Sequence, residues 1–225
     1  MKSETEVARL KRILPLEENQ KHLDTELLEV HRGILHSFAQ HGRPLDNAMI
    51  NKMLRGRTVS EVLTKLADND LVVLDEKKER VVGAYPFTTE KTPHTVEISG
   101  VKTYAMCAVD ALSISPMFDS EVTIESRCQV SGAPIRIRQF QMEILEAQPS
   151  PHVHVGVRWQ STRGCAAHSL CMEMVFVCDR ETAVKWQSED RENTSIFTLS
   201  EAIEFGAGFF LPLVGKEALV EKHCC

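Results

Sequence analysis

The sequence predicts an α+β protein, because a helical first third is followed by short segments rich in β-branched residues. In the first third, apolar residues recur at helical spacing between Leu23 and Phe38, and Gly42 and Pro44 then end the run. After Pro86, several short segments alternate apolar and polar residues, as half-buried strands do. A chain of 225 residues suits one large domain or two small ones. We place a boundary near residue 85, between a module of residues 1–85 and an α+β core of residues 86–225.

The first module is predicted to contain several helices and a hairpin. Ser3 and Glu6 have capping-box spacing for a short first helix, and after the helix of residues 23–38 a third helix is expected over 45–54. Thr58 and Glu61 have the same spacing and open a further helix, which runs to about Asn69. Two short strands, 71–74 and 81–84, flank a charged turn. Helices followed by such a hairpin make the module winged-helix-like.

A winged helix often binds DNA, but the charge of this chain argues against that role. The last helix of the module has Lys65 for phosphate contacts but also carries Glu61 and Asp68. The whole chain has 26 Lys and Arg against 32 Asp and Glu, a net charge of -6. We therefore expect no nucleic-acid partner, and a structural or partner-binding role for the module.

The second part is predicted to be an antiparallel or mixed sheet with flanking helices. The pair Val122 and Ile124 and the pair Ile135 and Ile137 show the two-residue alternation of half-buried strands. The expected strands cover residues 94–98, 121–129, 134–140, 142–147, 152–159 and 169–178. Two closing helices are expected over 181–187 and 199–211.

Other features limit the class of protein. No stretch approaches the roughly 20 apolar residues that cross a bilayer, and the charged N-terminal segment does not resemble a secretory signal. We therefore expect no membrane association. The seven cysteines are an odd and irregularly spaced set, which favours reduced thiols in the cytoplasm. The common phosphate-loop, dinucleotide, serine-hydrolase and zinc-protease motifs are missing from the sequence.

The segment from Tyr104 to Leu112 combines a thiol and a carboxylate. It contains good helix formers, and in a helix Cys107 and Asp110 lie on one face, three residues apart. Such a pair can hold a soft metal on sulfur while the carboxyl group moves a proton. A buried cysteine beside an ordinary helix aspartate has the same spacing, and from spacing alone this simpler interpretation is favoured.

The other cysteines and two histidines give weaker signals. On a strand, Cys171 and Cys178 point to opposite faces, and no two cysteines form a C-x-x-C pair that would favour a zinc ribbon. Cys128 precedes a Ser-Gly turn. His152 and His154 share one strand face, but a third metal ligand is missing, so a half-exposed polar face is the preferred interpretation. The remaining cysteines are a predicted loop thiol and a terminal pair: Cys165, Cys224 and Cys225.

Three segments together resemble the organomercurial lyase (alkylmercury lyase) family. They are Tyr104-Ala-Met-Cys-Ala-Val-Asp-Ala-Leu112, Ser126-Arg-Cys-Gln-Val-Ser-Gly-Ala-Pro134 and Ser169-Leu-Cys171, and Glu201-Ala202 before a Gly-containing apolar helix adds to the likeness. The resemblance implies that residues 86–225 are a catalytic core behind a helical, winged-helix-like part. It assigns the two mercury-binding cysteines to Cys107 and Cys171 and the catalytic carboxylate to Asp110. Cys128 matches a cysteine that is structural in the family.

The family chemistry supplies further expectations. The substrates are organomercurials, and the products are a hydrocarbon and Hg(II) held by two sulfurs, because mercury is a soft metal that prefers thiolates. Cys107 is expected to attack first, Cys171 to add the second sulfur and Asp110 to handle the proton. No organic cofactor is expected, but a small cellular thiol is needed to release Hg(II), and a mercury-reducing flavoenzyme is the implied recipient. Cys224 and Cys225 are candidates to assist that transfer.

The sequence departs from the family at two positions and leaves two other functions open. Met106 stands where Trp is frequent, and Met172 where a second Cys can occur, so the range of organic groups accepted is not defined. One alternative is a winged-helix transcription regulator that senses metal or oxidant through thiols. The other is a soft-metal carrier that binds mercury but releases no hydrocarbon.

Overall fold

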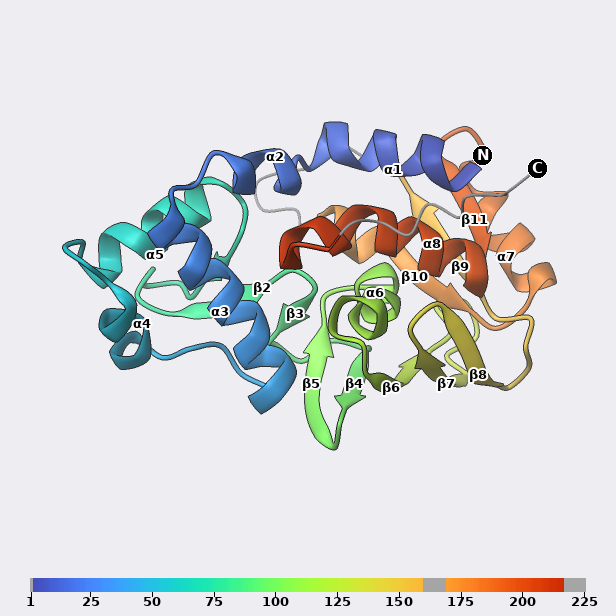
Figure 1. Ribbon diagram of the computed structural model, residues 1–225. Helices are drawn as coiled ribbons and strands as arrows, with labels where there is room; N and C mark the ends of the chain where they lie inside the picture. The colour runs from blue at the N-terminus through green and yellow to red at the C-terminus, as the bar shows by residue number, and fades with distance from the viewer. Residues whose placement is uncertain (1, 160–168, 217–225) are drawn as a thin grey trace, which may run out of the picture.

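Two antiparallel sheets and the helices packed against them confirm the predicted α+β class. The structure is a computed structural model that describes residues 2–159 and 169–216 (Figure 1). Its helices are α1 (Lys2–Ile13), α2 (Leu16–Lys21), α3 (Thr25–His41), α4 (Asn47–Met53), α5 (Val59–Asp68), α6 (Ala108–Phe118), α7 (Arg180–Gln187) and α8 (Leu199–Phe210), with short 3₁₀ helices η2 (Leu170–Glu173) and η3 (Leu211–Val214). Within these ranges, no helix has the length and apolar character needed to span a membrane.

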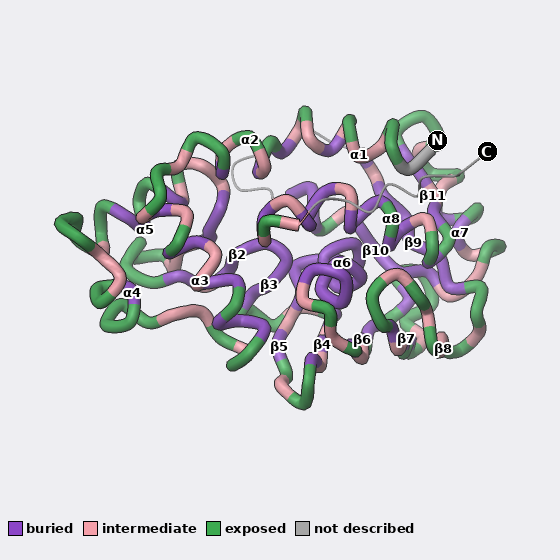
Figure 2. Tube along the Cα trace, viewed as in Figure 1, coloured by how far each residue is buried: buried purple, intermediate pink, exposed green. Residues whose placement is uncertain are grey.

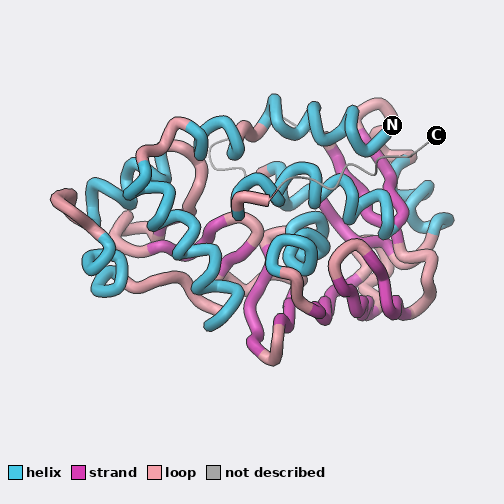
Figure 3. The backbone as a smooth tube through the Cα atoms, in the orientation of Figure 1, coloured by secondary structure: helices cyan, strands magenta, loops and turns pink. Residues whose placement is uncertain are grey.

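The larger sheet has eight strands in the order β1-β2-β3-β5-β4-β6-β7-β8, and the smaller has three in the order β10-β9-β11. The strands of the larger sheet are β1 (Val73–Leu74), β2 (Val81–Ala84), β3 (Phe87–Thr88), β4 (Thr95–Ile98), β5 (Val101–Ala105), β6 (Glu121–Arg127), β7 (Pro134–Phe140) and β8 (Glu143–Gln148). The strands of the smaller sheet are β9 (His154–Arg158), β10 (Met174–Val177) and β11 (Thr194–Thr198). Figure 3 shows most strands below α6 and α8 in this view, while the strands of the smaller sheet pass to the right of these helices.

The N-terminal helices and hairpin form close to the positions that the sequence predicts. The Asp24 side chain accepts a hydrogen bond from the backbone of Leu27 and so caps α3, which ends at Gly42 in the left-handed region. Thr58 and Glu61 make the predicted capping box at the start of α5. β1 and β2 pair as the expected antiparallel hairpin. The winged-helix assignment goes further than these elements and stays a prediction.

The two parts of the chain share one hydrophobic core. β2 lies before residue 85 and β3 after it, yet they pair in the same sheet. Helix α1 packs on α8, where Val7 faces Gly208, and the Arg9 guanidinium lies 4.5 Å from the ring centroid of Trp159. The boundary near residue 85 stays a prediction, but α1 packs with the second part.

Helix α6 lies in the centre of the molecule and contacts both sheets and α8. Its residues are buried from Ala108 to Met117, which Figure 2 shows as a helix coloured purple almost throughout. Pro116 lacks an N–H to bond the carbonyl of Leu112, and the side-chain amide of Gln139 donates to that carbonyl instead, at 2.8 Å. A strand of the large sheet therefore completes the hydrogen bonding of the buried helix, which holds the helix in a fixed position.

Two segments differ from the predicted elements. Strand β5 ends at Ala105, two residues before Cys107, and was not among the expected strands. The segment 169–178 was expected to be one strand, but Leu170–Glu173 forms the 3₁₀ helix η2, and β10 begins only at Met174. The reason is burial: all four residues of β10 are buried between β9 and the helices, whereas Met172 in η2 is 66% exposed. A uniformly buried strand shows no alternation, so its start cannot be read from periodicity.

Candidate active site

Cys107 occupies the N-cap position of α6, directly after β5. Its backbone is extended, and its Sγ accepts a hydrogen bond from the backbone N–H of Asp110 at 3.3 Å. The side chain therefore caps the helix and is fixed at the positive end of the helix dipole. The sequence interpretation placed Cys107 inside a helix turn; the structure puts it one position before the first turn, still beside Asp110.

Asp110 lies in the first turn of α6 and is completely buried, with 0% exposure. Neither carboxyl oxygen has a hydrogen-bond partner of ordinary geometry among the described residues. Burial disfavours the charged form more strongly than the nearby Cys107 and Cys171 thiols favour it, so the pKa of Asp110 is raised to about 7. A carboxyl group in this state can both accept and donate a proton near neutral pH.

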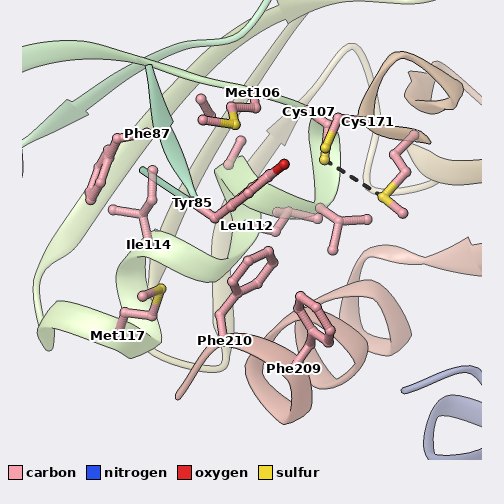
Figure 4. Packing of buried hydrophobic residues seen from close by; sticks show 14 of the residues in the cluster. Tyr85, Phe87, Met106, Cys107, Leu112, Ile114, Met117, Cys171, Phe209 and Phe210 are labelled. Carbon is pink, nitrogen blue, oxygen red and sulfur yellow. Dashed lines mark hydrogen bonds between the residues drawn. The ribbon is translucent and has the colours of Figure 1, made fainter. Parts of the chain in front are cut away.

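Cys171 reaches the same point from a distant part of the sequence. It lies on η2 and is 5% exposed, while the next residue, Met172, faces solvent. The Sγ atoms of Cys107 and Cys171 and a carboxyl oxygen of Asp110 all lie within 4.8 Å of one another. Figure 4 shows the two cysteines together above the buried cluster that contains Leu112. Cys107, Asp110 and Cys171 form the only group of three or more potential metal-ligating side chains in residues 2–159 and 169–216.

The resting state of Cys107 is a neutral thiol. Burial, the neighbouring Cys171 and the Asp110 carboxyl together raise the pKa of Cys107 well above the usual thiol value, although the helix N-terminus opposes this shift. The Cys107 thiol instead donates a hydrogen bond to the thioether sulfur of Met174 at 3.7 Å. A soft metal ion that binds here must therefore displace protons from sulfur.

Met174 is a site residue that the sequence interpretation missed. It begins β10, three residues after Cys171, and on the strand that the sequence predicted it faced away from that cysteine. The 3₁₀ turn changes the direction of the chain between them and brings the thioether to Cys107. A methionine shortly after a candidate cysteine is the only sequence signal that pointed to it.

The remaining candidate residues lie outside this group. Cys128 is buried but does not belong to the Cys107 cluster. His152 and His154 have no third ligand among the described residues, and the Nδ1–H of His154 donates to the His152 carbonyl at 2.6 Å. Met106 is buried with its methyl group against Gly83. Three further cysteines lie outside the described residues: Cys165, Cys224 and Cys225.

Comparison with known proteins agrees with this arrangement. The family model for alkylmercury lyase matches residues 87–211, a segment that includes all three members of the cluster. The chain is 30% identical over 151 residues to the alkylmercury lyase of Staphylococcus epidermidis, which is 67% of this chain and 68% of that protein. It is 25% identical over 175 residues to the alkylmercury lyase of Streptomyces lividans, covering 78% and 79% of the two chains.

A solved structure has the same fold. The crystal structure of the mercury-bound form of MerB2 superposes with a TM-score of 0.72 at 24% identity, covering 88% of this chain and 98% of that one. The family match covers more than half of the chain and contains the buried thiols and carboxyl group described above. The chain therefore belongs to the alkylmercury lyase family of enzymes.

Proposed function

We propose that this enzyme cleaves the carbon–mercury bond of organomercurials and that Cys107, Asp110 and Cys171 carry out the reaction. The observation that supports these roles is the joint position of two thiols and one unpartnered carboxyl group within 4.8 Å. Two sulfurs match the ligand preference of mercury, and the carboxyl group supplies the proton transfer that the carbon needs. Each requirement of the reaction is thus met by one of the three side chains.

Cys107 makes the first bond to mercury. An organomercurial R–Hg–X exchanges X for the Cys107 sulfur, and the thiol proton leaves with X as HX. The Cys107 sulfur is fixed at the helix N-terminus, where the backbone N–H of Asp110 and the helix dipole stabilise developing negative charge. The substrate at this stage is R–Hg–S(Cys107).

Cys171 and Asp110 complete the cleavage. The ionised Asp110 carboxylate accepts the Cys171 thiol proton as the Cys171 sulfur bonds to mercury. The second sulfur adds electron density to mercury and weakens the carbon–mercury bond. Asp110 then donates the same proton to the departing carbon. The products are R–H and Hg(II) held by two sulfurs, and Asp110 returns to its starting charge. The proton that enters the hydrocarbon is therefore the one that Cys171 gives up.

An external thiol completes the cycle. Two molecules of a small cellular thiol exchange onto Hg(II) and return their protons to Cys107 and Cys171. A reducing cytoplasm supplies that thiol and keeps the two cysteines from forming a disulfide. A mercury-reducing flavoenzyme is the recipient that family chemistry implies, with Cys224 and Cys225 as candidates to assist the transfer. No organic cofactor takes part in these steps.

Hydrocarbon release by purified variants tests the three roles. The parent enzyme, given phenylmercury and excess thiol, should release benzene. The isosteric changes Cys107→Ser, Cys171→Ser and Asp110→Asn should each lower the rate by at least about two orders of magnitude, since each removes a reacting group. Met117→Leu, at a buried methionine further along α6, is the matched control. Turnover near the parent rate in any of the three variants removes that residue from the scheme.

Single-turnover measurements test the thiol requirement. Without added thiol, hydrocarbon release should stop after one equivalent per chain, because Hg(II) stays on the two sulfurs. Added thiol should restore repeated turnover. Continued turnover without thiol contradicts the release step but not the cleavage step. A protein that binds the organomercurial tightly and releases no hydrocarbon under either condition is a carrier rather than a lyase.

A further inference from the structure

A second pair of cysteines lies at the other end of β10. Cys178 follows the last residue of β10, and Cys128 follows the last residue of β6. The backbone N–H of Cys178 donates to the Sγ of Cys128 at 3.4 Å. Next to it, the N–H of Gln129 donates to the carbonyl of Phe176 at 2.9 Å, which ties the two strand ends together. The backbone therefore fixes the two cysteines as neighbours.

Polar groups surround the outer sulfur of the pair. The Cys178 thiol donates to the Asp179 carboxylate at 3.4 Å, and it lies 3.7 Å from the Thr182 hydroxyl and 3.8 Å from the Ser131 hydroxyl. Ser131 is exposed and Cys178 is half-buried, whereas Cys128 is buried beneath them. The pair thus has one sulfur inside and one sulfur that solvent can reach.

The two sulfurs are in different electrostatic environments. Burial opposes ionisation of Cys128, but hydrogen bonds from Ser131 and from the backbone N–H groups of Val130 and Cys178 outweigh it, so the pKa of Cys128 is lowered. Burial and the hydrogen bond with Cys128 raise the pKa of Cys178, against the opposing effect of Thr182 and Ser131. The two thiols therefore interact directly, and the backbone N–H of Cys178 donates to the inner sulfur.

This pair is separate from the catalytic cluster. Met174 begins β10 beside the Cys107 thiol, and Cys178 follows its last residue. At about 3.3 Å per residue, the backbone positions of Met174 and Cys178 lie about 13 Å apart along the strand. Neither Cys128 nor Cys178 belongs to the group formed by the catalytic thiols and Asp110. One mercury ion cannot bridge the two pairs.

We propose that Cys128 and Cys178 form a second soft-metal site, which binds Hg(II) through both sulfurs. Binding exchanges two thiol protons for two Hg–S bonds and needs no oxidant. A hard or borderline metal needs further strong ligands. Among the described residues, Cys128 and Cys178 belong to no group of three potential metal-ligating side chains, whereas two thiolates satisfy Hg(II). The proposal concerns ion binding alone and does not depend on the cleavage mechanism.

Mercury retention by a protein with only these two cysteines tests the site. Serine replaces the other five cysteines: Cys107, Cys165, Cys171, Cys224 and Cys225. The reduced protein is loaded with HgCl₂ in millimolar monothiol and desalted, and its mercury content is measured. We expect one Hg(II) per chain with the ultraviolet charge-transfer band of a dithiolate. In the matched protein that also carries Cys178→Ser, affinity should fall by roughly a hundredfold, because chelation by a second sulfur is lost.

A second pair of proteins keeps the test decisive if the five replacements prevent folding. In the chain with Cys165, Cys224 and Cys225 replaced by serine, adding Cys178→Ser should reduce bound Hg(II) from two ions to one while hydrocarbon release is unchanged. Equal mercury content with and without Cys178 overturns the proposal. A pair that purifies as a disulfide under cytoplasmic conditions and binds mercury only after reduction also overturns it, in favour of a structural cross-link.

Discussion

The thiol of Cys107 donates a hydrogen bond to the thioether sulfur of Met174, and the two sulfur atoms lie 3.7 Å apart. The same Cys107 sulfur accepts a hydrogen bond from the backbone N–H of Asp110 at 3.3 Å. Met174 orients the Cys107 sulfur, and its thioether sulfur is a soft group next to the position where mercury binds.

Replacing this thioether should slow the reaction without unfolding the protein. Met174→Leu conserves volume, so its cost in stability should stay below about 1.5 kcal/mol. Loss of one neutral hydrogen bond that orients the nucleophile should lower kcat/KM by about threefold to tenfold. Stopped-flow measurement of hydrocarbon release gives the rate, with Met117→Leu as the control. Equal rates in both variants would mean that Met174 only fills space.

The rate should rise with pH through neutrality. Asp110 must be ionised to accept a thiol proton, and its pKa is about 7. Single-turnover kcat/KM should therefore increase about tenfold between about pH 6 and about pH 8. The raised pKa of Cys107 acts in the same direction and extends the rise to higher pH. A rate that falls with pH over this interval would show that the protonated carboxyl group is the form that starts the reaction.

The two buried histidines should each weaken the fold in mild acid. Burial lowers the pKa of His31 and of His94 to about 4, while an unfolded histidine titrates near about 6.5. Below about pH 6.5 these histidines bind protons in the unfolded chain but not in the folded chain, so their contribution to stability is full above this pH and falls as the pH drops towards 4. Each histidine should account for about 2 kcal/mol between about pH 7 and about pH 5.

Urea unfolding at the two pH values measures this loss. His31 accepts a hydrogen bond from the Gln20 side chain on Nδ1, which a protonated ring cannot do. The variant His31→Gln should be less stable at neutral pH but should lose about 2 kcal/mol less than the parent on acidification. An unaltered pH slope in that variant would assign the acid sensitivity to other groups.

Helix α8 packs closely on the catalytic helix α6 at Gly206. A Cβ at this position would overlap the Ser113 hydroxyl and press on the backbone carbonyl of Val109. Gly206→Ala should therefore destabilise the protein by about 1–3 kcal/mol and displace α6, with a fall in hydrocarbon release. Adding Ser113→Ala removes the main overlap and should recover part of the loss. Thermal unfolding of the two single variants and the double variant gives the coupling, and additive effects would rule out the contact.

The sequence predicted features that depend on neighbouring residues better than features that depend on packing between distant segments. The capping box at Thr58 and Glu61 forms as expected, because a cap involves residues three apart. The prediction of a single strand around Cys171 was wrong. The fully buried strand β10 carries no periodic signal, and the turn before it depends on packing against β9. The winged-helix label and the boundary near residue 85 stay predictions, and α1 packs against α8 at the opposite end of the sequence.

The site was predictable only through family resemblance. Spacing alone favoured an ordinary buried cysteine at Cys107, and no pattern within one segment reveals that Cys171 comes within 4.8 Å of it. The neighbour Met174 was missed for the same reason. Which sulfurs meet depends on β10 and η2 packing against α6, a long-range relation that a single sequence does not display.

The burial of Asp110 favours catalysis but lowers the stability of the fold. A carboxyl group held in a dry interior without partners weakens the fold, and an apolar residue of similar size there should raise the melting temperature while abolishing turnover. Selection for heat resistance alone would therefore discard this side chain. We expect this aspartate to be kept only where organomercurials are present. In their absence, substitutions that stabilise the fold and abolish activity should accumulate.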